Sequence, residues 1–137
     1  ARHDLFELAD AALAGDPARS LRILAGLRAE GVEVQRLNWM LGREIRLLTG
    51  VMAAMAEGQA EAAALRANGV WDKRAPLVRG AIRRHRRTGL LRLARLAARL
   101  EGTTKGMTGG DAWQECTWVT MALAGCRLPR VEAALLG

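Results

Sequence analysis

Tyrosine is absent from this chain of 137 residues, and its other aromatic side chains are one phenylalanine and four tryptophans. Apolar residues nevertheless make up 50% of the sequence, which is more than a disordered chain carries. Most of them are leucine and alanine, which favour helices, whereas the valine, isoleucine and threonine that favour sheets are few. The sequence therefore predicts a single all-α domain with a hydrophobic core.

Histidine and cysteine are scarce as well, with two residues of each. Cys116 and Cys126 lack the CxxC spacing of a metal site, so we interpret them as free thiols. His85 falls on the apolar side of its predicted helix and is interpreted as a histidine at the edge of the core, not as a general base. The glycine-rich residues 102–110 lack the order of a phosphate-binding loop. We therefore expect a non-catalytic domain with no metal and no other cofactor.

Long apolar runs are also missing. No stretch of 18 apolar residues occurs, so we expect no membrane span. The first residues, Ala1 to Asp4, contain neither an initiator methionine nor the pattern of a signal peptide. We therefore expect a cytoplasmic domain that is part of a longer chain.

Acidic residues are absent from residues 73–99, a segment that holds ten of the 21 lysines and arginines. The rest of the chain has eleven basic against fourteen acidic residues, so its net charge is −3. This segment predicts a polyanionic partner, and the alternative is a solvated surface. Trp71 precedes the segment and can either stack on an unpaired base or fill a helix junction. The candidate nucleic-acid contacts are Trp71, Lys73, Arg74, Arg83, Arg86 and Arg87.

Apolar residues with helical spacing predict a bundle of six or seven helices. The longest is expected over residues 33–56, and others over residues 4–13, 16–29, 59–67, 72–86, 89–100 and 112–124. Asp72 and Thr88 are the expected N-caps of two of them. Residues 126–137 are expected to form a short helix or a disordered tail after a helical domain of residues 1–125. The candidate core residues are Leu37, Leu41, Ile45, Leu48, Met52 and Trp113.

Some residues depart from the apolar pattern of these helices. Glu44 falls on the apolar face of the longest helix, so its carboxylate needs a basic partner, either within the domain or across a subunit interface. Trp39 falls on the opposite face of that helix. A narrow basic stripe runs along the helix of residues 89–100. The candidates for packing or for a subunit interface are Trp39, Arg43, Glu44, Arg92, Arg95 and Arg99.

Eight short segments occur together in a recognisable order. They are FELADAA at residues 6–12, Gly15-Asp16, LRAEGVE at 27–33, LNWMLGREIRLL at 37–48, VWDKR at 70–74, AIRRH at 81–85, Lys105-Gly106 and DAW at 111–113. In this order they resemble the C-terminal domain of the delta subunit of bacterial DNA polymerase III, a subunit of the clamp loader.

This resemblance implies an assembly role. In that family, the C-terminal domain joins the gamma/tau and delta-prime type subunits in a closed collar, while missing AAA+-like N-terminal parts contact the sliding clamp. The collar lies beside primer–template DNA, and the resemblance implies a template contact for Trp71. Some relatives carry an aromatic residue in the loop after Lys105-Gly106, where this chain has Met107-Thr108-Gly109. The alternative function is a stand-alone helical nucleic-acid-binding domain that uses residues 73–99.

Overall fold

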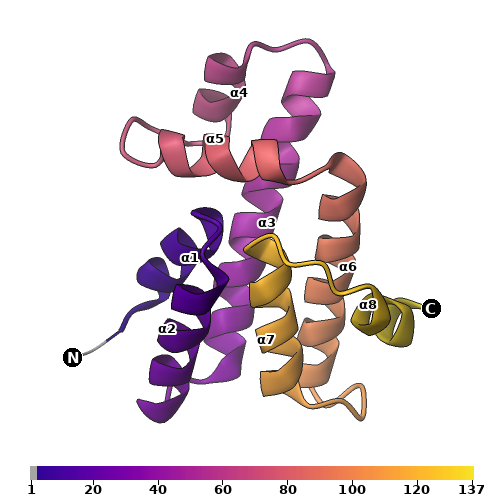
Figure 1. Ribbon diagram of the computed structural model, residues 1–137. Helices are drawn as coiled ribbons and strands as arrows, with labels where there is room; N and C mark the ends of the chain where they lie inside the picture. Colours follow the sequence, from indigo (N-terminus) through magenta and orange to yellow (C-terminus); the bar gives the residue numbers. More distant parts are fainter. Residues whose placement is uncertain (1–2) are drawn as a thin grey trace.

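Eight α-helices and their connections form residues 3–137, the part of the chain that the computed structural model describes (Figure 1). In chain order, the helices are α1 (Leu5–Leu13), α2 (Pro17–Ala29), α3 (Val34–Ala56), α4 (Glu61–Ala67), α5 (Ala75–Arg84), α6 (Arg87–Thr104), α7 (Ala112–Leu123) and α8 (Pro129–Leu136). No strand occurs among the described residues, which confirms the all-α prediction. The expected count of six or seven helices was too low, because α8 forms within the expected tail. Ala1 and Arg2 of the predicted domain lie outside the described residues.

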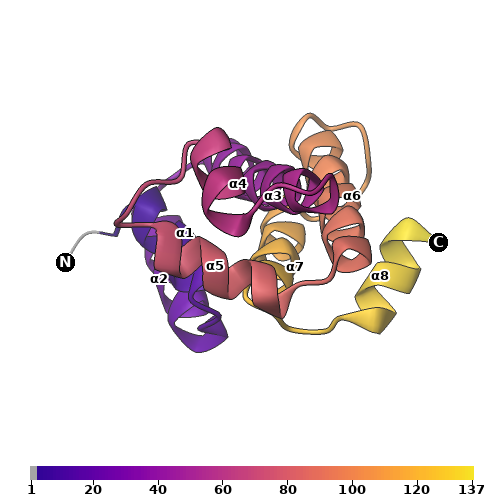
Figure 2. The same cartoon turned by 90° about the horizontal axis from the view of Figure 1, so that it is seen from above.

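The long helix α3 is the axis of the domain. It contacts α1, α4, α5, α6 and α7. Figure 1 shows α1 and α2 on one side of α3, α6 and α7 on the other, and α4 and α5 across one end. The last helix, α8, lies against α6 (Figure 2). Helices from both halves of the sequence therefore share one core around α3.

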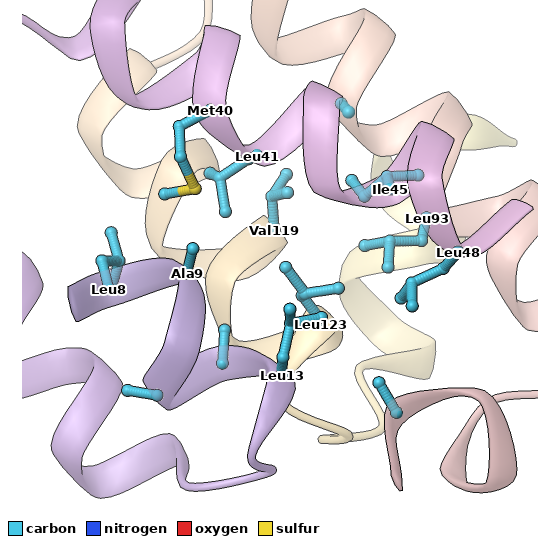
Figure 3. Close-up of a cluster of buried hydrophobic side chains, with 14 of the residues drawn as sticks. Leu8, Ala9, Leu13, Met40, Leu41, Ile45, Leu48, Leu93, Val119 and Leu123 are labelled. Carbon is cyan, nitrogen blue, oxygen red and sulfur yellow. The ribbon is translucent and has the colours of Figure 1, made fainter. Parts of the chain in front are cut away.

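The core consists mainly of leucine side chains that recur at intervals of three or four residues on each helix. Figure 3 shows α3 contributing Leu41, Ile45 and Leu48, which meet Leu13 of α1 and Leu123 of α7. Among the predicted core residues, those that are buried are Leu37, Leu41, Ile45 and Leu48, and those that are half-buried against the core are Met52 and Trp113.

Aspartate caps begin three of the helices. Asp4, Asp16 and Asp111 each accept a hydrogen bond from the backbone N–H three residues later. The expected cap at Asp72 was wrong, because residues 71–75 form a turn in which the N–H groups of Arg74 and Ala75 donate to the carbonyl of Trp71. That turn delays α5 until Ala75.

The predicted bounds of α6 were also wrong. Arg86 is the N-cap residue, so Thr88 lies inside the first turn and does not cap it. The helix continues past Leu100 to Thr104, since Thr103 is buried and its hydroxyl donates to the carbonyl of Arg99. The longer helix extends the surface that α6 shares with α3.

No helix of the described residues is long and apolar enough to cross a membrane.

Candidate interaction surfaces

An open groove of about 440 Å³ lies between α3 and α6. The apolar part of its lining is built from small side chains and one isoleucine, namely Gly42, Ile45, Ala94, Ala97 and Ala98. The polar part consists of Gln35, Asn38, Arg46, Glu101, Thr104 and Lys105. Because glycine and alanine fill little space, the two helices leave a hollow that a side chain from another molecule can enter.

Trp39 lines this groove from α3, and 57% of its surface is exposed. The guanidinium carbon of Arg43, one helical turn further along α3, lies 5.7 Å from the centre of the Trp39 ring. At that distance a cation–π attraction holds the two exposed side chains together. The structure therefore places both candidates at the surface, beside an apolar hollow.

A second exposed tryptophan lies in the loop between α4 and α5. Trp71 exposes 65% of its surface, and Lys73 in the same loop is exposed as well. Trp71 therefore does not fill the helix junction, which was the alternative left open by the sequence.

Arg74 ties this loop to the core. Its guanidinium pairs with the carboxylate of Glu44, which is only 3% exposed, and its Nη2 also lies 3.6 Å from an Asp10 carboxylate oxygen. Glu44 thus has its basic partner inside the domain. Arg74, a candidate nucleic-acid contact, lies in a partly buried ion pair, and the exposed end of the loop is formed by Trp71 and Lys73 instead.

The arginines at the end of α5 differ in their surroundings. Arg79 Nε lies 2.6 Å from a Glu61 carboxylate oxygen, and Arg83 Nη2 lies 3.5 Å from the same atom. Arg86 and Arg87 are exposed, and neither forms a hydrogen bond or ion pair with another described side chain. Apart from Lys73, the exposed and unpartnered basic groups of the segment therefore lie where α5 ends and α6 begins.

Arg84 crosses from this corner to α1 and α7. Both of its terminal nitrogens donate to the carbonyl of Leu13, at 3.1 and 3.2 Å. Gly15 and Gly125 have φ of +74° and +98°, and a Cβ at either residue would approach the Arg84 side chain to 2.5 and 2.7 Å, respectively. The positive φ favours glycine at both positions, and any larger residue there would also displace the Arg84 side chain.

The basic stripe of α6 is used within the domain. Arg92 Nε lies 3.6 Å from Glu132 of α8, and Arg95 Nη2 donates to the carbonyl of Leu136 at 3.2 Å. Arg99 Nε lies 3.7 Å from Glu115 of α7. These contacts join α6 to its neighbours.

Glu115 is a structurally important residue that the sequence analysis missed. It is 3% exposed and accepts a hydrogen bond of 2.8 Å from the hydroxyl of Thr103. Its position was readable, because Glu115 precedes Val119 by four residues and so falls on the apolar face of α7. The same signal had singled out Glu44.

The comparison with known proteins identifies the family. A family described as "Processivity clamp loader gamma complex DNA pol III C-term" matches residues 5–130. The chain belongs to this clamp-loader family. It is also similar to the DNA polymerase III subunit delta of Escherichia coli (strain K12), with 31% identity over 132 residues that make up 96% of this chain and 38% of that relative. The chain thus spans well under half the length of that relative, and the resemblance inferred from the eight segments is confirmed.

The family match covers the groove, the tryptophan loop and the basic corner, but not the contacts of α6 with Glu132 and Leu136. Residues 5–130 include α1 to α7 and the first two residues of α8. Both exposed tryptophans and the Glu44–Arg74 pair therefore lie within the range of residues that the family model matches.

Burial shifts the pKa of two side chains of the clamp-loader domain, His85 and Cys116. Burial lowers the pKa of His85, the hydrogen bond to the Leu123 carbonyl opposes this, and the charge of Arg84 lowers the pKa further. The Nε2 atom of His85 lies 2.8 Å from that carbonyl oxygen. Burial raises the pKa of the Cys116 thiol to about 12, which keeps it protonated at neutral pH.

No group of three potential metal ligands from histidine, cysteine, aspartate and glutamate occurs among residues 3–137. The surfaces that this part of the chain offers are an apolar groove with a tryptophan, an exposed tryptophan loop and a basic corner. Such surfaces are suited to binding other macromolecules.

Proposed function

We propose that this chain is the subunit-assembly domain of a bacterial clamp-loader delta subunit and acts in the cytoplasm. It joins the gamma/tau and delta-prime type subunits in a collar and so helps to load the sliding clamp onto primed DNA in chromosomal replication. The domain itself performs no catalysis and needs no cofactor. The sliding clamp is contacted by other parts of the full-length subunit. The family match over residues 5–130 is the observation that carries the proposal.

The groove between α3 and α6 supports the assembly role. Tryptophan and arginine are enriched among the residues that dominate binding energy at protein interfaces, and Trp39 with Arg43 provides such a pair on the surface. The apolar lining between Gly42 and Ala98 offers room for an apolar side chain of a partner helix. A partner that covers Trp39 would remove a large apolar surface from water.

Co-purification of the chain with the other loader subunits tests this proposal. Trp39→Ala should weaken the association by about 2 kcal/mol, roughly thirtyfold in Kd, as expected for an interface hot spot. Trp71→Ala is the matched control, because it removes an equally large exposed side chain from a different surface and should leave the association unchanged. A folded wild-type chain that bound none of these subunits would disprove the assembly role.

A DNA contact is the second part of the proposed function. The exposure of Trp71 favours it, because a solvent-exposed indole can stack on an unpaired base, and the neighbouring Lys73 is exposed to meet the phosphate backbone. The family match does not favour the alternative of a stand-alone DNA-binding domain. We therefore place this contact within the assembled loader.

Binding of single-stranded DNA by the reconstituted loader tests this contact. Trp71→Ala should raise Kd about tenfold, since stacking on one base contributes roughly 1–3 kcal/mol, whereas Trp71→Phe should retain most of the affinity. Trp39→Ala cannot serve as the control here, because it weakens assembly, so Trp113→Phe is used instead. Equal affinities for Trp71→Ala and the wild type would remove Trp71 from the DNA interface.

A further inference from the structure

A basic cleft of about 480 Å³ lies where the end of α5, the start of α6 and the segment from α7 to α8 meet. One wall is formed by the corner from Arg84 to Gly89, and the other by residues 125–129 together with Glu132. Figure 2 shows the connection from α7 to α8 running past the end of α5 and the start of α6. The cleft therefore joins two parts of the chain that are about 40 residues apart.

Four arginines line this cleft, and they face one acid. Arg84, Arg86, Arg92 and Arg127 are the basic residues of its lining, and Glu132 is the acid. The remaining titratable side chains of the lining are His85, whose lowered pKa keeps it uncharged at neutral pH, and Cys126. A concave surface with this excess of positive charge concentrates anions from solution.

The arginines of the cleft are engaged to different degrees. Arg84 donates to a backbone carbonyl, and Arg92 lies 3.6 Å from Glu132. Arg86 lines the cleft from the corner between α5 and α6, and Arg127 lines it from the segment between α7 and α8. Both are exposed, and neither forms a hydrogen bond or an ion pair with another described side chain. Two unpartnered guanidinium groups that line one cleft can each present two N–H donors to an anionic group, the geometry by which arginine binds phosphate.

We propose that this cleft binds the phosphodiester backbone of a DNA strand, with Arg86 and Arg127 as the principal contacts. The inference rests on the proposed function and adds to it a site that includes the segment between α7 and α8. A strand is favoured over a small anion because the exposed and unpartnered Arg87 follows Arg86 at the start of α6, and because α5, between the cleft and Trp71, has no acidic residue. The cleft and Trp71 lie at opposite ends of α5, which has ten residues and is therefore about 15 Å long. One DNA strand covers this distance with roughly five phosphates. A single strand can therefore contact both the cleft and Trp71.

The effect of Glu132 on DNA binding distinguishes binding in the cleft from binding to the positive charge of the whole domain. Its carboxylate stands in the cleft and pairs with Arg92, so it competes with an incoming phosphate for that guanidinium. Neutralising it by Glu132→Gln should therefore tighten DNA binding, although the residue is remote in sequence from the acid-free segment. Neutralising an acidic residue outside the cleft, which changes only the net charge, should lower Kd less than Glu132→Gln does.

The proposal is tested by fluorescence anisotropy of a labelled oligothymidylate, with the full-length subunit in the assembled loader, across a series of salt concentrations. The double variant Arg86→Ala/Arg127→Ala should raise Kd more than tenfold and reduce the salt slope of log Kd by about 1.4, because each lost phosphate contact on a single strand contributes about 0.7. Glu132→Gln should lower Kd severalfold. The control double variant Arg19→Ala/Arg22→Ala removes the same charge from exposed positions on α2.

Equal losses in the two double variants would overturn the proposal, because binding would then follow net charge alone. An unchanged salt slope in Arg86→Ala/Arg127→Ala would overturn it as well. Two competitors test the nature of the anion. If polyglutamate of equal charge displaced the DNA as effectively as unlabelled oligothymidylate, the cleft would bind acidic peptides and not DNA in particular. If inorganic phosphate at millimolar concentration displaced the DNA, the cleft would be a site for free phosphate.

Assembly with the other loader subunits separates this inference from the proposed function. Both double variants should assemble normally, since the mutated residues lie outside the groove between α3 and α6. Normal assembly with unaltered DNA binding in Arg86→Ala/Arg127→Ala refutes the cleft and leaves the assembly role in place. Failure of the wild type to assemble refutes the proposed function itself.

Discussion

The arginines of the acid-free segment fall into two groups that the amino-acid sequence does not distinguish. Arg74 and Arg99 pair with carboxylates that are nearly inaccessible to solvent, Glu44 and Glu115. Arg86 and Arg87 are exposed and have no partner among the described side chains. The comparison shows that one run of positive charge can serve two purposes, internal pairing at some positions and external binding at others.

Removing Arg74, the partner of the buried Glu44, should lower the free energy of unfolding much more than removing an exposed arginine of the same segment. Arg74→Met removes the partner of a buried carboxylate, and breaking such a pair costs about 3 kcal/mol. Arg87→Met, the matched control at an exposed position, should change the free energy of unfolding by less than about 0.5 kcal/mol. Urea denaturation monitored by circular dichroism measures both. Equal effects of the two substitutions would remove the distinction.

Glu115 should give a smaller effect of the same kind. Glu115→Gln keeps an acceptor for the Thr103 hydroxyl but removes the charge that faces Arg99. We expect a loss of about 1–2 kcal/mol, because the buried Arg99 Nε atom would lose the opposite charge that lies 3.7 Å from it. Glu101→Gln, at an exposed site on α6, is the control. Thermal unfolding that shifted equally in both variants would show that Glu115 acts only through surface charge.

The contact between Arg92 and Glu132 should contribute least to the free energy of unfolding. Both side chains retain access to solvent, and pairs of this kind contribute roughly 0–1 kcal/mol. Glu132→Gln should therefore leave the melting temperature nearly unchanged while increasing the hydrogen exchange of α8, which has no buried residue of its own. A global loss of stability would place this pair with Glu44 and Arg74 instead.

His85, which is half-buried beside Arg84, should add a small pH dependence to the free energy of unfolding. Its pKa is lowered in the folded state, so the unfolded chain takes up a proton first as the pH falls. The stabilisation is complete above the unfolded pKa of about 6.5 and is lost as the pH falls through the lower folded value. Melting temperatures between pH 5 and 8 should decline less in His85→Gln than in the wild type. Parallel pH profiles would show that the histidine stays accessible to protons in the folded chain.

The sequence was a good guide to helices and a poorer guide to their ends. Regular leucine spacing predicted α3 and its core residues, and Asp16 followed by Pro17 predicted the start of α2. The start of α5 was wrong because a turn at Trp71 took up the backbone groups that Asp72 was expected to cap. Local propensity carries no information about a turn that is held by a distant ion pair.

The sequence indicated which residues were candidates for a site, but it did not indicate which residues they would contact. Glu44 was expected to need a basic partner, and yet the choice of Arg74 depends on the approach of two elements 30 residues apart. Arg127 was not singled out, because only the return of the chain after α7 brings it into the same cleft as Arg86.

The sequence by itself determined that this protein is helical, that its apolar surface suffices for a core, and that its net excess of positive charge lies in residues 73–99. These properties follow from composition and from the local period of the α-helix. Tertiary structure alone decided which arginines are neutralised inside the domain, which tryptophans are exposed, and where a groove and a basic cleft open. Those outcomes depend on distances between segments far apart in the chain, and such distances are set by the packing of α3 against its neighbours.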